Sequence, residues 1–148
     1  IGTTEGRALL GSYVWVDDVE RFRRLAAAMA VAARVPATVV QMDAADFVVD
    51  LELADGTTTI VWHSAMWVYL PAPTQQRILD GIARLGRGSG PDRVLVHASW
   101  EWAAPRDGMG EFALVTRTWN GSTTDGLPEV LATGMSHGHP VRLFSAGE

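Results

Sequence analysis

Two stretches of the chain carry apolar side chains at helical spacing. In residues 17–34 they recur three or four positions apart, at Val19, Phe22, Leu25, Met29 and Ala32. Asp17 followed by Glu20 resembles a capping box with Asp in place of Ser or Thr. The second stretch follows Pro73, which suits a first helical turn, and ends before Gly86, which is placed to cap a carboxyl end. The pattern predicts helices over residues 17–34 and from Pro73 to Gly86.

Three short apolar runs predict buried strands, at residues 38–42, 58–62 and 93–99. The helix after Pro73 lies between the last two runs, which is the order of a parallel crossover unit. Residues 47–53 fit two structures. They predict a short helix N-capped by Asp46 with Phe47 and Leu51 facing inward, or an alternating strand that turns at Asp55-Gly56. We favour the helix, because it lets strand 58–62 run parallel to strand 38–42.

The pattern changes after residue 110. Residues 112–119 alternate between two faces, Asn120-Gly121 suits a tight turn, and residues 128–134 and 141–144 continue as strands. This part predicts antiparallel pairing. The whole pattern therefore predicts an α/β fold with parallel strands followed by an antiparallel carboxyl-terminal hairpin.

Composition narrows the possible functions. A length of 148 residues suits one domain, 1–148, and a hydrophobic share of 47% excludes a disordered chain. A net charge of −5 opposes nucleic-acid binding, because Arg21, Arg23 and Arg24 form the only basic cluster and fit the solvated face of a helix. No apolar run approaches the roughly 20 residues of a membrane span. The lack of cysteine fits a cytoplasmic protein.

The segment from Val61 to Pro71 carries the strongest candidate chemistry. Here an apolar strand leads directly into four polar or aromatic side chains, His63, Ser64, Trp67 and Tyr69. Open α/β sheets bind ligands just beyond the carboxyl ends of their strands, and Glu101 follows the neighbouring predicted strand. His63 suits a general base or a ligand contact, with Glu101 as its partner. The alternatives are a hydrogen-bonded structural histidine and a solvated carboxylate.

Weaker signals accompany this segment. Ser64 is a poor nucleophile for His63, because adjacent strand residues point to opposite faces. His137 and His139 have a spacing that suits metal ligands but lack a third ligand nearby in sequence, so we assign no metal site. Four tryptophans at the predicted strand exits fit either a ligand wall or core packing: Trp62, Trp67, Trp100 and Trp102.

The order of these segments resembles a known fold. Asp43-Ala-Ala-Asp-Phe47, the run from Thr58 to Ser64, Tyr69-Leu-Pro and the run from Val94 to Glu101 resemble strands three to five of the class I S-adenosylmethionine-dependent methyltransferases. More narrowly, three stretches resemble an uncharacterised, largely actinobacterial domain-of-unknown-function family, number 2332. They are Val14-Trp-Val-Asp-Asp-Val-Glu-Arg, the segment from Val61 to Pro71, and His137-Gly138, within a match over roughly residues 7 to 148.

The resemblance implies that the chain is the carboxyl-terminal portion of a protein with a methyltransferase-like, three-layer Rossmann fold. The activity of such a protein is not established by the resemblance. The resemblance places Asp43 against the cofactor's adenine and His63-Ser64 beside the transferred methyl group. If the protein is an enzyme, the resemblance implies a transferase, with His63, Tyr69 and Glu101 as catalytic residues and His137 as a further candidate. Asp43 and Ser64 would then bind the cofactor.

The glycine loop that holds the cofactor lies upstream of the matched segment in those enzymes. We therefore expect this chain alone to bind no cofactor, with S-adenosylmethionine implied only by the resemblance. We also expect strands 38–42 and 58–62 either to pair directly or to be joined by a second chain or an upstream region. A small-molecule ligand fits the site. The alternatives are a non-catalytic binding or assembly module and, third, a small hydrolase or metal enzyme.

Overall fold

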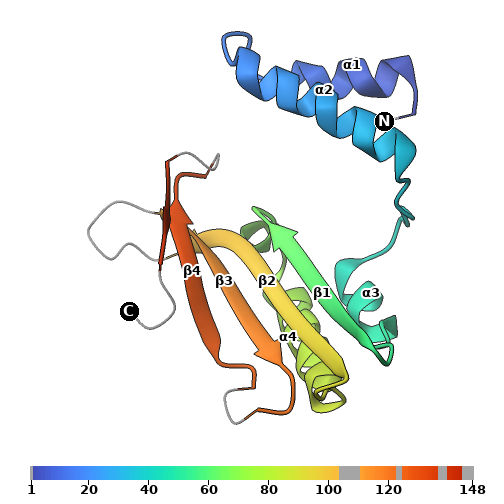
Figure 1. Ribbon diagram of the computed structural model, residues 1–148, viewed down its shortest axis with the longest axis vertical. Coiled ribbons are helices and arrows are strands. Elements are labelled where there is room, and N and C mark those ends of the chain that lie inside the picture. Colours follow the sequence, from blue (N-terminus) through green and yellow to red (C-terminus); the bar gives the residue numbers. More distant parts are fainter. Residues whose placement is uncertain (1, 104–110, 123–124, 137–139, 145–148) are drawn as a thin grey trace. The chain divides into compact units, whose positions relative to one another are not determined.

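The computed structural model describes residues 2–103, 111–122, 125–136 and 140–144 (Figure 1). The chain divides into two compact units, residues 1–41 and residues 42–148. The first unit is a pair of helices, and the second contains a sheet with two helices packed on it. The single domain expected over residues 1–148 stays a prediction.

The first unit consists of α1 (Thr4–Ser12) and α2 (Val19–Arg34). The predicted helix over residues 17–34 is confirmed, although its cap is Asp18, whose carboxylate accepts from the Arg21 amide at 2.9 Å. The helix α1 had no counterpart among the predicted elements. Gly6 donates its amide to Thr3 Oγ1 at the start of α1, so it belongs to a capped helix.

The predicted strand at residues 38–42 is wrong. These residues are exposed and form neither helix nor strand. Strand propensity depends on a neighbouring strand to pair with and a face to bury, and the described sheet offers this run neither. Direct pairing with strand 58–62 is therefore also wrong, whereas completion of the sheet by a second chain stays a prediction.

The favoured helix within residues 47–53 is confirmed in kind but begins earlier, as α3 (Ala44–Asp50). Its cap is Asp43, not Asp46, and the Asp43 carboxylate accepts from the amides of Ala45 and Asp46. Because of this shift, Ala45 and Val48 are buried instead of Phe47, which is 46% exposed.

The crossover unit is confirmed. It comprises β1 (Thr57–Ser64), α4 (Ala72–Arg87) and β2 (Arg93–Ala103), and β1 and β2 are parallel. The helix α4 continues beyond the predicted cap at Gly86 and ends at Arg87, with Gly88 as its C-cap. Gly86 instead lies beneath Trp119, where it has room for no side chain. A short 3₁₀ turn, η1 (Trp67–Tyr69), connects β1 to α4.

The antiparallel part is confirmed as well. It consists of β3 (Glu111–Trp119), β4 (Pro128–Gly134) and β5 (Val141–Leu143), which follow β2 in the sheet in chain order. Gly121 has a φ of 86°, which suits the predicted turn at Asn120-Gly121. The fold of this unit is therefore α/β with a five-stranded mixed sheet.

The core lies on one face of this sheet. Side chains of α3, α4 and β2 form it, with Leu95 of β2 fully buried. The alternation of β1 places Val61 against this core, whereas Ile60 and Trp62 are 63% and 55% exposed. Within residues 42–148, the helices thus cover one face of the sheet, and β1 forms one edge of the described strand order. No helix of the described ranges has the length and apolar character needed to cross a membrane.

Candidate functional site

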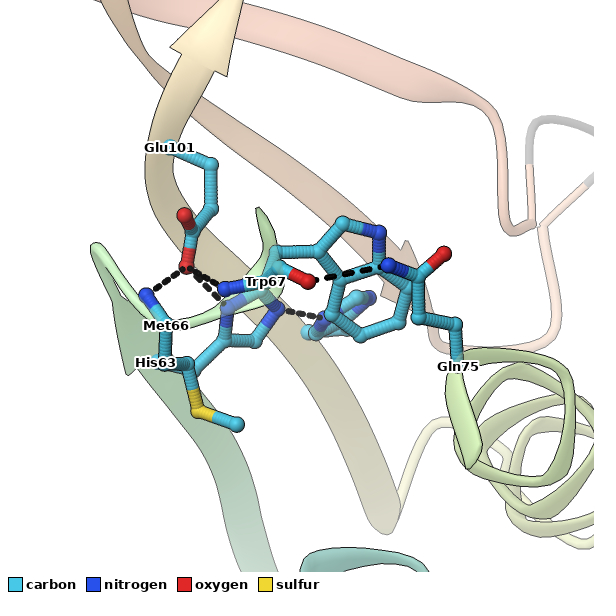
Figure 2. A network of polar contacts seen from close by, with 6 residues as sticks. His63, Met66, Trp67, Gln75 and Glu101 are labelled. Carbon is cyan, nitrogen blue, oxygen red and sulfur yellow. Dashed lines mark hydrogen bonds and ion pairs between the residues drawn. The ribbon is translucent and has the colours of Figure 1, made fainter. Parts of the chain in front are cut away.

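The site lies where β1 and β2 end on the helix-bearing face of the sheet. Side chains two residues apart on a strand share a face, so His97, Ser99 and Glu101 follow Leu95 on that face of β2. The parallel register places the Cα of His63 opposite that of Ser99. Strand pairing therefore brings His63 and Glu101 together, 38 positions apart in the sequence (Figure 2).

A single oxygen of Glu101 holds the site together. Oε1 lies 2.8 Å from His63 Nδ1, and it accepts from the backbone amides of Met66 at 3.1 Å and Trp67 at 3.3 Å (Figure 2). Its other oxygen, Oε2, is buried without a hydrogen-bond partner among the described residues. Glu101 thereby fixes both the ring of His63 and the turn that follows β1.

A second histidine extends this arrangement. The Nε2 atoms of His63 and His97 lie 3.0 Å apart, a distance that requires one of the two nitrogens to carry the shared proton. The pKa of His97 is lowered from its ordinary value to about 4. Burial is the largest cause, followed by the charge of His63 and then that of Arg117. His97 is therefore neutral near pH 7. With His63 Nδ1–H directed at Glu101, the neutral pair is arranged so that His97 Nε2–H donates to His63 Nε2.

The turn after β1 positions an aromatic wall. Ala65 has a φ of 51°, an uncommon conformation for a residue with a β-carbon, and its amide donates to the Trp100 carbonyl at 3.0 Å. Gln75 of α4 donates to the carbonyl of Trp67 at 2.9 Å (Figure 2). It also donates to the carbonyl of Leu70 at 3.1 Å. The indole of Trp67 stacks on the ring of His63, with centroids 5.2 Å apart and planes 22° apart.

These groups open into a cleft of about 370 Å³. His63, His97, Ser99, Glu101 and Arg117 supply its polar lining, and its other walls are mostly apolar: Trp67, Leu79, Trp102, Ala103, Ala113 and Val115. The size is within the range of small-molecule sites, and so is a mostly apolar wall with a few convergent polar groups.

The other predicted site residues lie elsewhere. The Tyr69 side chain is 82% exposed and does not line the cleft. Ser64 is the exposed last residue of β1, and the carboxylate of Asp43 caps α3. Of the four tryptophans, Trp67 and Trp102 line the cleft. His137 and His139 are outside the described residues.

Three polar residues of the cleft were not among the predicted site residues, His97, Ser99 and Arg117. A signal for His97 was present, because it precedes Glu101 by four positions in a strand and must share its face. Arg117 carried no such signal. It joins the site because the antiparallel register of β2 and β3 places its Cα opposite that of His97.

The arrangement suits proton transfer to or from a bound molecule. A carboxylate that holds one nitrogen of an imidazole fixes the ring, and an oriented imidazole is a common general base. Within the described ranges, no three side chains of the metal-binding types gather so that they could hold a metal ion.

Comparison with known proteins identifies a family. Neither the curated proteins nor the solved structures yielded a match to this chain. A family model described as "Uncharacterized protein conserved in bacteria (DUF2332)" matches residues 1–142. That match includes every described element of the sheet except the last residue of β5, and all the residues that line the cleft. The chain therefore belongs to this family of uncharacterised bacterial proteins.

Proposed function

We propose that the cleft binds a small molecule and that His63, oriented by Glu101, acts as the general base for it through His97. One observation carries the proposal. A carboxylate and two imidazoles form a continuous hydrogen-bonded series that opens into a cleft of about 370 Å³. Perturbed titratable groups that converge in a cleft are typical of functional sites.

Both nitrogens of His63 are already engaged, Nδ1 with Glu101 and Nε2 with His97, so the proton is transferred through His97. His97 Nδ1 takes the proton from the ligand while His97 Nε2–H passes to His63 Nε2, and the charge then resides on His63. The Nδ1 atom of His63 lies 2.8 Å from the carboxylate of Glu101, whereas burial and the charges of His63 and Arg117 lower the pKa of His97. The two histidines thus have different roles. His97 passes the proton on, and His63 holds the resulting charge.

The relation to class I methyltransferases is a proposal about the fold. It is supported by the order of β1, α4 and β2 and by the antiparallel strands after them. In such a protein, a general base at this position would remove the proton of a hydroxyl or amine acceptor. The described residues do not fit S-adenosylmethionine, because the Asp43 carboxylate is occupied in capping α3 and Ser64 faces solvent. We derive no step through that cofactor.

The test begins with ligands found by thermal shift in a library of small molecules that carry weakly acidic C–H groups. Their exchange with deuterium is then followed by NMR in D₂O. His63→Asn keeps an N–H donor near Glu101 but has no titratable base. We expect it to retain ligand binding and to lose about 10²–10⁴-fold in protein-catalysed exchange, the usual contribution of a general base.

Tyr69→Phe is the matched control, because Tyr69 is exposed and does not line the cleft. It should leave both binding and exchange unchanged. Exchange that persists in His63→Asn would exclude His63 as the base. Ligands that bind without any catalysed exchange would favour a binding module.

A non-catalytic binding or assembly module is the second candidate. It is favoured by the exposed apolar side chains on the helix-free face of β1, Ile60 and Trp62. Such a module would retain its partner when His63 is replaced, because His63 lies on the opposite face of the strand.

A further inference from the structure

We propose that the cleft is selective for a small carboxylate with an apolar body, and that Arg117 binds the carboxylate group. This inference rests on the proposed function and adds a substrate class to it. It begins from a half-buried cation in the middle of β3, on the same face of the sheet as the two histidines.

The guanidinium of Arg117 is held in place but not neutralised. Its Nη1 donates to the carbonyl of Gly126 at 3.0 Å, which fixes the group while one of its five N–H donors is used. Among the described residues, no carboxylate forms an ion pair with Arg117. A partly buried cation without a counter-ion is costly, so the cleft favours an anionic occupant.

Glu101 does not serve as that counter-ion. Its Oε1 accepts from His63 and from two backbone amides, so this charge is used within the turn after β1. The charge of Arg117 instead reaches His97, where it contributes to the lowered pKa. The cleft thus contains one cation available to a ligand and one carboxylate whose Oε1 is already engaged.

The apolar walls of the cleft determine which kind of group the carboxylate of the ligand is attached to. Trp67, Trp102 and Leu79 face the cleft together with Val115, so a bound molecule buries apolar surface there. A volume of about 370 Å³ suits a ligand on the scale of a substituted benzoate. A planar guanidinium matches a carboxylate through two parallel hydrogen bonds. An inorganic phosphate would leave the apolar walls without contacts.

The binding mode also orients the reaction. Arg117 and His97 are paired across neighbouring strands, and His97 contacts His63. A ligand that places its carboxylate on Arg117 therefore has its body beside the general base. The anionic group acts as the anchor, and the proton that His63 removes through His97 belongs to the part of the ligand next to it.

The experiment compares benzoate with benzamide, which has nearly the same shape without the charge. Binding is followed by the indole resonances of the tryptophans in NMR titrations of the full chain. We expect benzoate to bind at least tenfold more tightly than benzamide. Arg117→Gln should remove this preference, and Arg117→Lys, which keeps the charge without the fork, should retain part of it.

Arg142→Gln is the control, because Arg142 is an exposed arginine of β5 and does not line the cleft. It should leave the preference for benzoate intact, and unchanged amide spectra would establish that each variant is folded. Equal binding of benzoate and benzamide, or a preference that survives in Arg117→Gln, would overturn the assignment. So would inorganic phosphate that competes as strongly as benzoate.

His63→Asn separates this inference from the proposed function. If Arg117 binds the carboxylate, this variant keeps the preference for benzoate even where His63 proves not to be a base. If His63 is a base but Arg117 is not the anchor, exchange is lost in His63→Asn while the preference for benzoate persists in Arg117→Gln.

Discussion

The imidazole of His97 is the most constrained titratable group of the site. It is 7% exposed, and its pKa is lowered to about 4, mainly by burial and also by the charges of His63 and Arg117. An unfolded chain would protonate the same histidine near pH 6.5. Between these two values the unfolded state binds a proton that the folded state does not, so folding stability decreases as the pH falls from about 6.5 to about 4.

We therefore expect His97→Gln to weaken this dependence on pH. Glutamine keeps a polar group near the Nε2 position but does not titrate, so the variant should lose up to about 2 kcal/mol of the decrease between pH 7 and pH 5. Urea unfolding at pH 7 and pH 5 measures the difference for each protein. An equal decrease in the variant and the wild type would assign the acid sensitivity to other groups.

Ala65 shows that the turn beside the site is conformationally strained. It is the non-glycine residue with positive φ in the described chain, and it lies between Ser64 and Met66, whose amide binds Glu101. A left-handed conformation costs a residue with a β-carbon roughly 1–2 kcal/mol. Such strain is common where a turn must direct groups toward a ligand site.

Close packing of α4 against the sheet depends on a glycine. A β-carbon on Gly86 would lie 2.6 Å from Nε1 of Trp119, and an indole held between α4 and the sheet has little room to shift. The indole of Trp119 in turn packs against the core cluster. The separation of α4 from β3 is thus determined by this one position.

Gly86→Ala should destabilise the protein by about 1–3 kcal/mol, the usual cost of overpacking. This exceeds the roughly 1 kcal/mol by which alanine is the better helix former. Gly88→Ala is the control at the same end of α4, since its β-carbon would lie 3.4 Å from the Leu85 carbonyl and its φ is −93°. Thermal unfolding measures both, and a Gly86→Ala variant as stable as Gly88→Ala would contradict the packing argument.

The described part of the chain contains a cleft that is lined by neither Asp43 nor Ser64, the residues that the resemblance assigns to the cofactor. Tight binding of S-adenosylmethionine requires a glycine loop that lets the backbone approach and an acidic group on the ribose. The cap role of Asp43 removes the acidic group that the resemblance had placed near the adenine. Within the part of the chain that the structure describes, the glycines with positive φ occupy turns at 56, 121 and 126.

We therefore expect this chain to bind S-adenosylmethionine no more tightly than about millimolar, which corresponds to about 4 kcal/mol of standard binding free energy. Isothermal titration calorimetry measures this directly. Asp43→Asn, which keeps an oxygen for the cap, serves as the matched variant. Micromolar binding that is lost in Asp43→Asn would restore the methyltransferase interpretation and the cofactor role of Asp43.

The sequence alone was sufficient for the crossover unit and for half of the site. Residues 72–87 have helical spacing and lie between two apolar runs. These three segments bury their apolar faces when they fold as strand, helix and strand, and this order brings the ends of the two parallel strands to one edge of the sheet. His63 and Glu101 follow those strands directly, so their proximity required no knowledge of other contacts. These features depend on local periodicity and on chain order.

Tertiary structure decided the rest, because the remaining features depend on neighbours distant in the sequence. Residues 38–42 have the composition of a strand but no strand beside them, and an isolated run gains nothing from an extended conformation. Arg117 lines the cleft only because β3 pairs with β2 in this register. A shift of one residue would turn its side chain to the other face of the sheet. The low pKa of His97 likewise arises from burial and from charges on other strands, and periodicity within one strand contains no information about either.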